Sequence, residues 1–137
     1  MGIFPRCSVG DQEAKGTGDD GAFFETFEGL IHKYGITVDR PKGTSHPRFP
    51  DLIYPIDYGF INNTQSQDGE GIDIFIGDNG GAGIVGIICT VDSVNGDSEV
   101  KVLYHCTEEN IRTALKMMNN GPMRGILMKR KTIPIKK

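Results

Sequence analysis

Long apolar runs and an excess of basic charge are both missing from this sequence, and each absence argues against a class of protein. No apolar run approaches the roughly 20 residues that a membrane-spanning helix needs, and the N-terminus has no charged segment followed by an apolar core. We therefore expect neither a membrane protein nor a signal peptide. Basic charge is not in excess either, because 15 Lys and Arg stand against 18 Asp and Glu, a net charge of −3. This balance provides no general attraction to nucleic acid or to an anionic membrane.

Cysteine is also scarce. Cys7, Cys89 and Cys106 are odd in number, widely spaced and without a CxxC motif. They predict neither a disulfide framework nor a zinc ribbon, and a reducing cytoplasm fits them best.

The chain has the length of one ordinary domain, with 137 residues. Residues 1–22 are rich in Gly, Asp and other small or polar types, so we expect a flexible arm there. Residues 23–131 are predicted to form a single domain, and residues 132–137 a basic, solvated tail.

Short strands dominate the predicted secondary structure. Apolar residues recur at helical spacing over 22–34, where Gly35 can end the helix, and Thr107 can cap a second helix. Strand patterns cover 36–39, 52–60, 72–77, 83–94, 98–106 and 124–129. Few helices and no βαβ alternation predict a mainly β, α+β fold: a small antiparallel barrel with one N-terminal and one C-terminal helix.

The segment QDGEGID, residues 67–73, places three carboxylates within six positions, those of Asp68, Glu70 and Asp73. The two intervening glycines allow a bend that turns all three toward one point. Like charges gathered in this way repel unless something neutralises them. A hard divalent cation such as Mg²⁺, Mn²⁺ or Ca²⁺ suits carboxylate oxygens.

A second acidic cluster is predicted around a hairpin. Asn95-Gly96 is a strong signal for a two-residue type I′ turn, which would set Asp92 directly opposite Glu99. Carboxylates in that position repel unless a cation lies between them. Lys101, on the same face as Glu99, offers a point charge suited to phosphate.

Each of these patterns has an ordinary structural alternative. Acidic residues beside glycine are most often solvated turn residues. Lys101 alone is typical of a surface lysine, and Tyr54 and Tyr58 are typical of a core or a barrel lining.

The block from Leu52 to Asp73, LIYPIDYGFINNTQSQDGEGID, resembles the signature of soluble family I inorganic pyrophosphatases, in which YPxNYGxI leads into DGDPxD. DRPKGTSHP is similar to the family's EIPKGS strand, and DSVNGDSEVK to its second acidic segment. The resemblance extends over about 36–105. It implies a five-stranded OB-like barrel that hydrolyses pyrophosphate to two phosphates, with water held between divalent metals.

The resemblance also implies roles for single residues. The metal ligands would be Asp39, Asp68, Asp73, Asp92 and Glu99. Glu70 would be the base that takes the proton from the attacking water, and Tyr58 would form a hydrogen bond within the site. Lys101 and Arg48 would contact phosphate, and Arg40 is a competing match for Arg48. The implied cofactor is Mg²⁺, with Mn²⁺ as the alternative. The implied partner is a small phosphorylated substrate, pyrophosphate. Whether the chain forms a homo-oligomer is left open.

The chain departs from the family pattern at several points. Glu70 and Gly71 replace the usual Asp and Pro, and a hairpin that carries a phosphate-binding arginine is missing before Leu52. Two alternatives therefore stay open. One is a metal-dependent hydrolase of a larger phosphoester or nucleotide, and the other is a non-catalytic descendant that binds metal, phosphate or a protein partner.

Overall fold

The structure of this chain is a computed structural model that describes residues 20–66 and 68–131. In chain order the elements are α2 (Asp20–Tyr34), β1 (Ile36–Arg40), β2 (Asp57–Ile61), β3 (Ile72–Ile76), β4 (Ile84–Asp92), β5 (Asp97–Tyr104), α3 (Glu108–Met117) and β6 (Met123–Lys129). Both predicted helices and the α+β class are confirmed. Most of the predicted flexible arm and all of the predicted basic tail lie outside the described residues.

The N-terminal helix α2 begins before its predicted start. Asp20 and Gly21, which we expected in the arm, lie in its first turn. The helix ends at Tyr34, and the next residue, Gly35, has a φ of 81° that favours glycine. The Gly35 N–H closes the last turn by donating to the Ile31 carbonyl at 2.8 Å.

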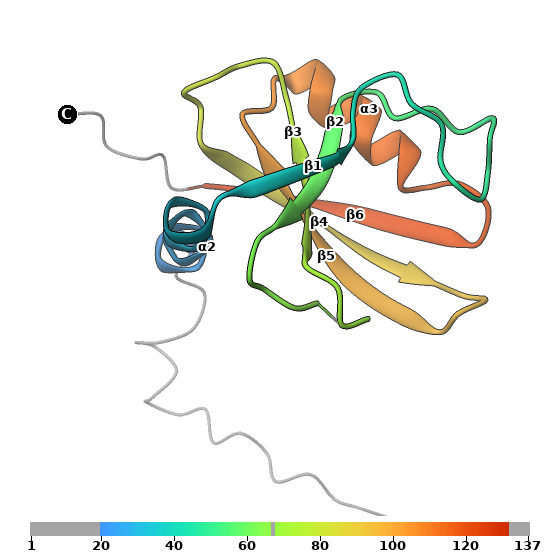
Figure 1. Cartoon of the computed structure of the whole chain (residues 1–137), viewed down its shortest axis with the longest axis horizontal. Coiled ribbons are helices and arrows are strands. Elements are labelled where there is room, and N and C mark those ends of the chain that lie inside the picture. Colours follow the sequence, from blue (N-terminus) through green and yellow to red (C-terminus); the bar gives the residue numbers. More distant parts are fainter. Residues whose placement is uncertain (1–19, 67, 132–137) are drawn as a thin grey trace, which may run out of the picture.

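The six strands form one open, mixed sheet in the order β1-β2-β3-β5-β4-β6 (Figure 1). Neighbouring strands are antiparallel except for β3 and β5, which are parallel. The prediction of a small antiparallel barrel is therefore wrong, because the sheet is open and mixed. In the part of the chain that the structure describes, β1 pairs only with β2 and β6 pairs only with β4, so the sheet keeps two edges.

The strand order differs from the order along the chain because the β4–β5 hairpin joins the sheet through its second strand, β5, which pairs with β3. The glycine-rich connection over 77–83 carries the chain away from β3, and β5 returns to lie beside it. Asp73 and Lys101 thereby become direct partners across the parallel pair. Sequence patterns identify both strands of a hairpin, but they do not say which strand meets the rest of the sheet.

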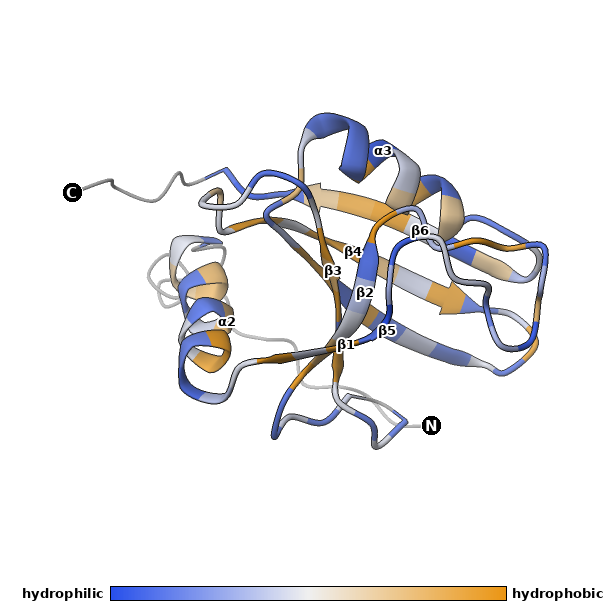
Figure 2. Cartoon of the chain, turned by 45° about the horizontal axis from the view of Figure 1, so that its top comes forward, coloured by the Kyte–Doolittle hydropathy of each residue, from blue (hydrophilic) through white to orange (hydrophobic). Residues whose placement is uncertain are grey.

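The two helices cover opposite faces of the sheet (Figure 2). On one face α2 packs Phe24 and Ile31 against Ile74, Ile87 and Val102. The other face carries a cluster of buried apolar side chains that α3 joins, namely Phe75, Ile88, Leu103, Ile111, Ala114 and Met117. The α3 face continues past this apolar half into a polar half, which forms a pocket.

Side chains near the two ends of the described chain tie α2 to the residues after β6. The Arg130 guanidinium, whose side chain is only 4% exposed, donates to Glu28 Oε2 at 3.0 Å. The same Glu28 oxygen accepts from the Ile84 N–H at 3.2 Å. The backbone N–H of Lys131 donates to Asp20 Oδ2 at 2.6 Å. These contacts hold α2 against the β4 and β6 side of the sheet.

Replacing Thr107 with alanine is expected to lower the free energy of unfolding by about 1 kcal/mol. Thr107 Oγ1 accepts from the Asn110 N–H at 3.0 Å, and Asn110 Oδ1 accepts from the Thr107 N–H at 2.9 Å, so both helix-end donors are satisfied in a capping box. Urea denaturation measures the change. Thr26→Ala, within α2, is the control and should leave the stability equal or slightly higher. An equal loss in both variants would contradict the capping role.

Candidate active site

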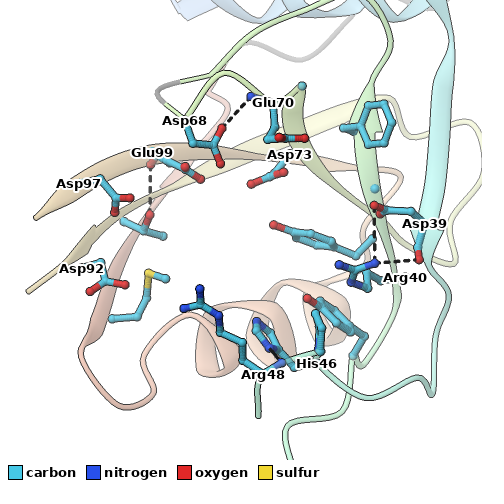
Figure 3. A pocket seen from close by; sticks show the side chains of 18 of the residues that line it. Asp39, Arg40, His46, Arg48, Asp68, Glu70, Asp73, Asp92, Asp97 and Glu99 are labelled. Carbon is cyan, nitrogen blue, oxygen red and sulfur yellow. Dashed lines mark hydrogen bonds and ion pairs between the residues drawn. The ribbon is translucent and has the colours of Figure 1, made fainter. Parts of the chain in front are cut away.

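The polar half of the α3 face forms a pocket of about 470 Å³ with two unlike walls. Figure 3 shows carboxylates in an arc along one wall and basic side chains across from them. The acidic wall consists of Asp68, Glu70, Asp73, Asp92, Asp97 and Glu99. The opposite wall carries Arg40, His46 and Arg48. The pocket is therefore complementary in charge to a ligand that carries charges of both signs.

Lys101 lies beneath the acidic wall as an internal cation. Its Nζ donates to Asp73 Oδ2 at 2.6 Å, to Glu99 Oε1 at 2.9 Å and to the Tyr58 hydroxyl at 3.2 Å. The side chains of Lys101, Glu99 and Asp73 are 8%, 11% and 21% exposed. Burial works to lower the pKa of Lys101, but its neighbours outweigh that effect and hold the pKa above its ordinary value. Lys101 is therefore charged and fully engaged with the protein.

Asp68 and Glu99 form a close carboxyl pair at the centre of the acidic wall. Asp68 Oδ1 accepts from the Glu70 N–H and from Ser66 Oγ, both at 2.9 Å. The Glu70 N–H is the main reason that the pKa of Asp68 is lowered, and smaller contributions come from Ser66 and Glu99. Burial raises the pKa of Glu99, and the charges of Asp73 and Asp68 add to that rise against the effect of Lys101. Adjacent carboxylates with opposed pKa shifts are typical of a site that accepts a proton or a cation.

The β4–β5 turn differs from the predicted two-residue turn. Asp92 Oδ1 accepts from the N–H groups of Val94 and Asn95, at 2.9 and 3.0 Å, which makes Asp92 the start of a four-residue loop. Asp92 consequently pairs with Asp97, and Glu99 pairs with Thr90. The prediction that Asp92 faces Glu99 is therefore wrong, because the Asp92 side chain competes with the tighter turn. The corrected register adds Asp97 to the pocket.

An irregularity in β1 shapes the end of the opposite wall. The pairing of β1 with β2 shifts between Val38 and Arg40, so that Asp39 is an extra residue, as in a β-bulge. Both Asp39 and Arg40 line the pocket, and they form an ion pair at 3.7 Å. Asp39 lies across the pocket from the other carboxylates (Figure 3). The structure therefore does not bring Asp39 together with the remaining predicted metal ligands.

His46 organises the loop that carries Arg48. His46 Nδ1 accepts from the backbone N–H groups of Arg48 and Phe49, at 3.0 and 3.3 Å. The Arg48 side chain extends toward the middle of the pocket (Figure 3), and among the described residues it forms no ion pair. Arg48 is thus presented to a ligand on a constrained loop.

The free energy of unfolding is expected to fall as the pH decreases below 6.5, in part because of His46. Burial lowers the pKa of His46 from 6.5, and the charges of Arg40, Arg48 and Lys101 lower it further. Below pH 6.5 the unfolded state therefore binds the proton more readily, so this contribution to stability is present above 6.5 and is lost as the pH falls through the folded pKa. Urea denaturation between pH 7.5 and 5 measures it.

A His46→Gln variant tests the source of that pH dependence. Its unfolding free energy should change less over the same pH range than that of the wild-type chain, because the titrating ring is gone. His105, whose pKa burial also lowers, remains in both proteins and contributes to the residual slope. An identical slope in the two proteins would rule out His46 as the cause.

The pocket fits a hard divalent cation by the type of its donors. Carboxylate oxygens are the side-chain ligands that Mg²⁺ and Mn²⁺ prefer. Within residues 20–66 and 68–131, however, no group of three or more His, Cys, Asp or Glu side chains is arranged to hold a metal ion. Asp73 and Glu99 bind Lys101 instead, and Asp92 binds its own turn. The donor chemistry is present, but the donors are not already assembled around one point.

Aromatic residues of the pocket were missed as a group by the sequence interpretation. Tyr54 and Tyr58 were noted, whereas Phe49 was not connected with them. The available signal was the clustering of His46, Phe49 and Tyr54 around prolines in one short stretch. Their contact depends on the bridge between Ser45 and Ile53, which folds that stretch back on itself.

Other observations bear on the class of protein. Cys89 and Cys106 are free thiols. In the part of the chain that the structure describes, neither helix has the length and apolar character needed to cross a membrane. Comparison of the chain with protein-family models, with curated proteins and with solved structures gives no match.

Proposed function

We propose that this chain hydrolyses a phosphoanhydride, most simply inorganic pyrophosphate, with the help of Mg²⁺ or Mn²⁺. The observation that carries the proposal is the pocket with one acidic and one basic wall. A metal–pyrophosphate complex carries both signs of charge, so its cation suits the carboxylates and its phosphate oxygens suit the arginines. The local resemblance of Leu52–Asp73 to the pyrophosphatase signature supports the same chemistry.

The carboxylates proposed to hold the cation are Asp68, Asp73, Asp92 and Glu99. Asp97 joins them because it lies on the same wall. Asp68 is well prepared for this role, because its lowered pKa keeps it ionised. A bound cation would polarise phosphoryl oxygens and lower the pKa of a coordinated water.

Glu70 is proposed to take the proton from the attacking water. It is exposed at the acidic wall, and its carboxylate forms no hydrogen bond with another described residue, so it is free to move toward a ligand.

Lys101 has a different role from the predicted phosphate contact. It positions Asp73 and Glu99, together with the Tyr58 hydroxyl, from beneath the pocket.

Arg48 is proposed to bind phosphate in preference to Arg40. The Arg48 guanidinium extends toward the centre of the pocket, whereas Arg40 is paired with Asp39 at 3.7 Å. A guanidinium without a carboxylate partner can offer both of its parallel N–H groups to phosphate oxygens.

Phosphate release from pyrophosphate, measured with Mg²⁺ and with a chelator, tests this proposal. We expect release that the chelator abolishes and that Asp68→Asn strongly reduces. Asp51→Asn is the matched control, because Asp51 is exposed on the β1–β2 loop outside the pocket. A folded wild-type chain that releases no phosphate with either Mg²⁺ or Mn²⁺ would refute pyrophosphate hydrolysis.

A non-catalytic phosphate-binding protein is the second candidate. It is favoured by the finding that the acidic side chains of the described residues are not assembled into a metal site. Calorimetric titration with phosphate, in the presence and absence of Mg²⁺, separates the two candidates. Phosphate binding that depends on Arg48 but not on Mg²⁺ would support the non-catalytic function.

A further inference from the structure

A row of aromatic rings runs from the core of the α3 face to the pocket. Phe75 contacts Tyr58 at a centroid distance of 4.8 Å, and Tyr58 contacts Tyr54 at 5.0 Å. Tyr54 in turn stacks on His46 at 6.1 Å with an interplanar angle of 12°, and His46 contacts Phe49 at 5.1 Å. Phe75 is fully buried, whereas Phe49, the outermost ring, is 54% exposed. The row therefore ends in an accessible aromatic ring at the pocket.

The loop fixes the backbone of Phe49 beside the pocket. Its N–H donates to His46 Nδ1 at 3.3 Å, and its carbonyl accepts from the Leu52 N–H at 2.9 Å. Pro47 and Pro50 restrict the backbone on either side. Because the backbone that carries the ring is already ordered, less conformational entropy is lost when a ligand packs against the ring.

Phe49 is adjacent in sequence to Arg48, whose guanidinium extends into the same pocket. Inorganic pyrophosphate has no apolar surface and gains nothing from an exposed phenyl ring. A nucleotide carries both a planar base, which stacks on aromatic side chains, and phosphates, which arginine binds. The volume of about 470 Å³ lies within the range of sites for ligands of that size, ~300–1,000 Å³.

We propose that the substrate is a nucleoside polyphosphate, whose base stacks on Phe49 while its terminal phosphates lie between Arg48 and the acidic wall. This inference rests on the proposed function and names its substrate class. With adenosine triphosphate, the water oxygen forms a bond to the terminal phosphorus and the bridging P–O bond breaks. The products are adenosine diphosphate, orthophosphate and one proton, which Glu70 accepts.

Equilibrium binding by calorimetry, in Mg²⁺, tests the base subsite without turnover. The probes are the β,γ-methylene analogue of adenosine triphosphate and methylenediphosphonate, which resists hydrolysis and lacks a base. We expect the nucleotide analogue to bind about tenfold more tightly, since base stacking on an aromatic ring has about that effect or more. Phe49→Ala should remove this advantage, and Phe49→Trp should retain it. Phe23→Ala, at an exposed ring on α2, is the matched control and should change neither affinity.

Equal affinities for the two probes, an equal weakening of both by Phe49→Ala, or no binding of either would overturn the inference. Phosphate release from pyrophosphate, measured in parallel, reports on the proposed function separately. Release without a Phe49-dependent preference for the nucleotide analogue leaves pyrophosphate as the substrate and overturns the base subsite. Nucleotide binding through Phe49, without phosphate release from pyrophosphate or from adenosine triphosphate, supports the subsite and overturns the hydrolytic function.

Discussion

Replacing Lys101 with methionine is expected to lower the free energy of unfolding by about 3 kcal/mol, because it leaves buried charge without a partner. Lys101 Nζ is the shared cation between Asp73 and Glu99, and all three side chains are largely buried. Methionine keeps most of the volume of the lysine chain, so the loss reports on charge and hydrogen bonding rather than on a cavity. Urea denaturation at neutral pH and moderate salt measures it.

The exposed pair between Lys129 and Glu108 provides a matched control. Its 2.8 Å separation is close to those of the Lys101 pairs, but its side chains are 51% and 75% exposed. Lys129→Met should therefore change the stability by less than about 1 kcal/mol. If the two substitutions had equal effects, Lys101 would not be the buried counter-ion described above.

Mg²⁺ should also stabilise the Lys101→Met variant more than the wild-type chain, because the variant's carboxylates lack their internal cation.

Replacing Asp73 with asparagine is expected to reduce Mg²⁺-dependent phosphate release by on the order of 100-fold or more. Loss of a residue that only orients a metal ligand already reduces metal affinity or activity by ~10–100-fold, and Asp73 is proposed to bind the metal directly. The fold should survive, because the asparagine oxygen can still accept from Lys101 Nζ, which also keeps Glu99 as a partner. Initial rates over a range of Mg²⁺ concentrations measure the effect.

Two results would identify Asp73 as a metal ligand rather than a general support of the fold. The Mg²⁺ concentration that gives half-maximal rate should rise in Asp73→Asn, while the urea midpoint changes little. Asp51→Asn, away from the pocket, should change neither quantity. Full activity in Asp73→Asn would contradict the assignment of Asp73 to the metal site.

Local signals predicted the elements of this fold, while long-range pairing decided its topology. The helix end at Gly35 and the cap at Thr107 depend on a few neighbouring residues, and both were predicted correctly. The partnership of β3 with β5 depends instead on how the hairpin docks as a unit. No nearby residue encodes that choice, which is why an antiparallel barrel was expected.

The same division holds for the candidate site. The glycines of QDGEGID indicated that Asp68, Glu70 and Asp73 would gather, and the structure places all three on one wall. The position of Lys101 beneath that wall was not predictable, because it follows from the parallel register with Asp73. The turn at Asp92 was misjudged because one side-chain hydrogen bond decides between two loop lengths.

The contact between Asp20 and Lys131 means that the chain, trimmed to residues 20–131, could be rearranged as a circular permutant. The Lys131 N–H donates to Asp20 Oδ2 at 2.6 Å, so a short glycine and serine linker would be long enough to join these two residues. New termini could be opened between Gly80 and Gly81, on the exposed connection between β3 and β4. Neither junction lies among the residues that line the pocket, so we expect the permutant to retain it.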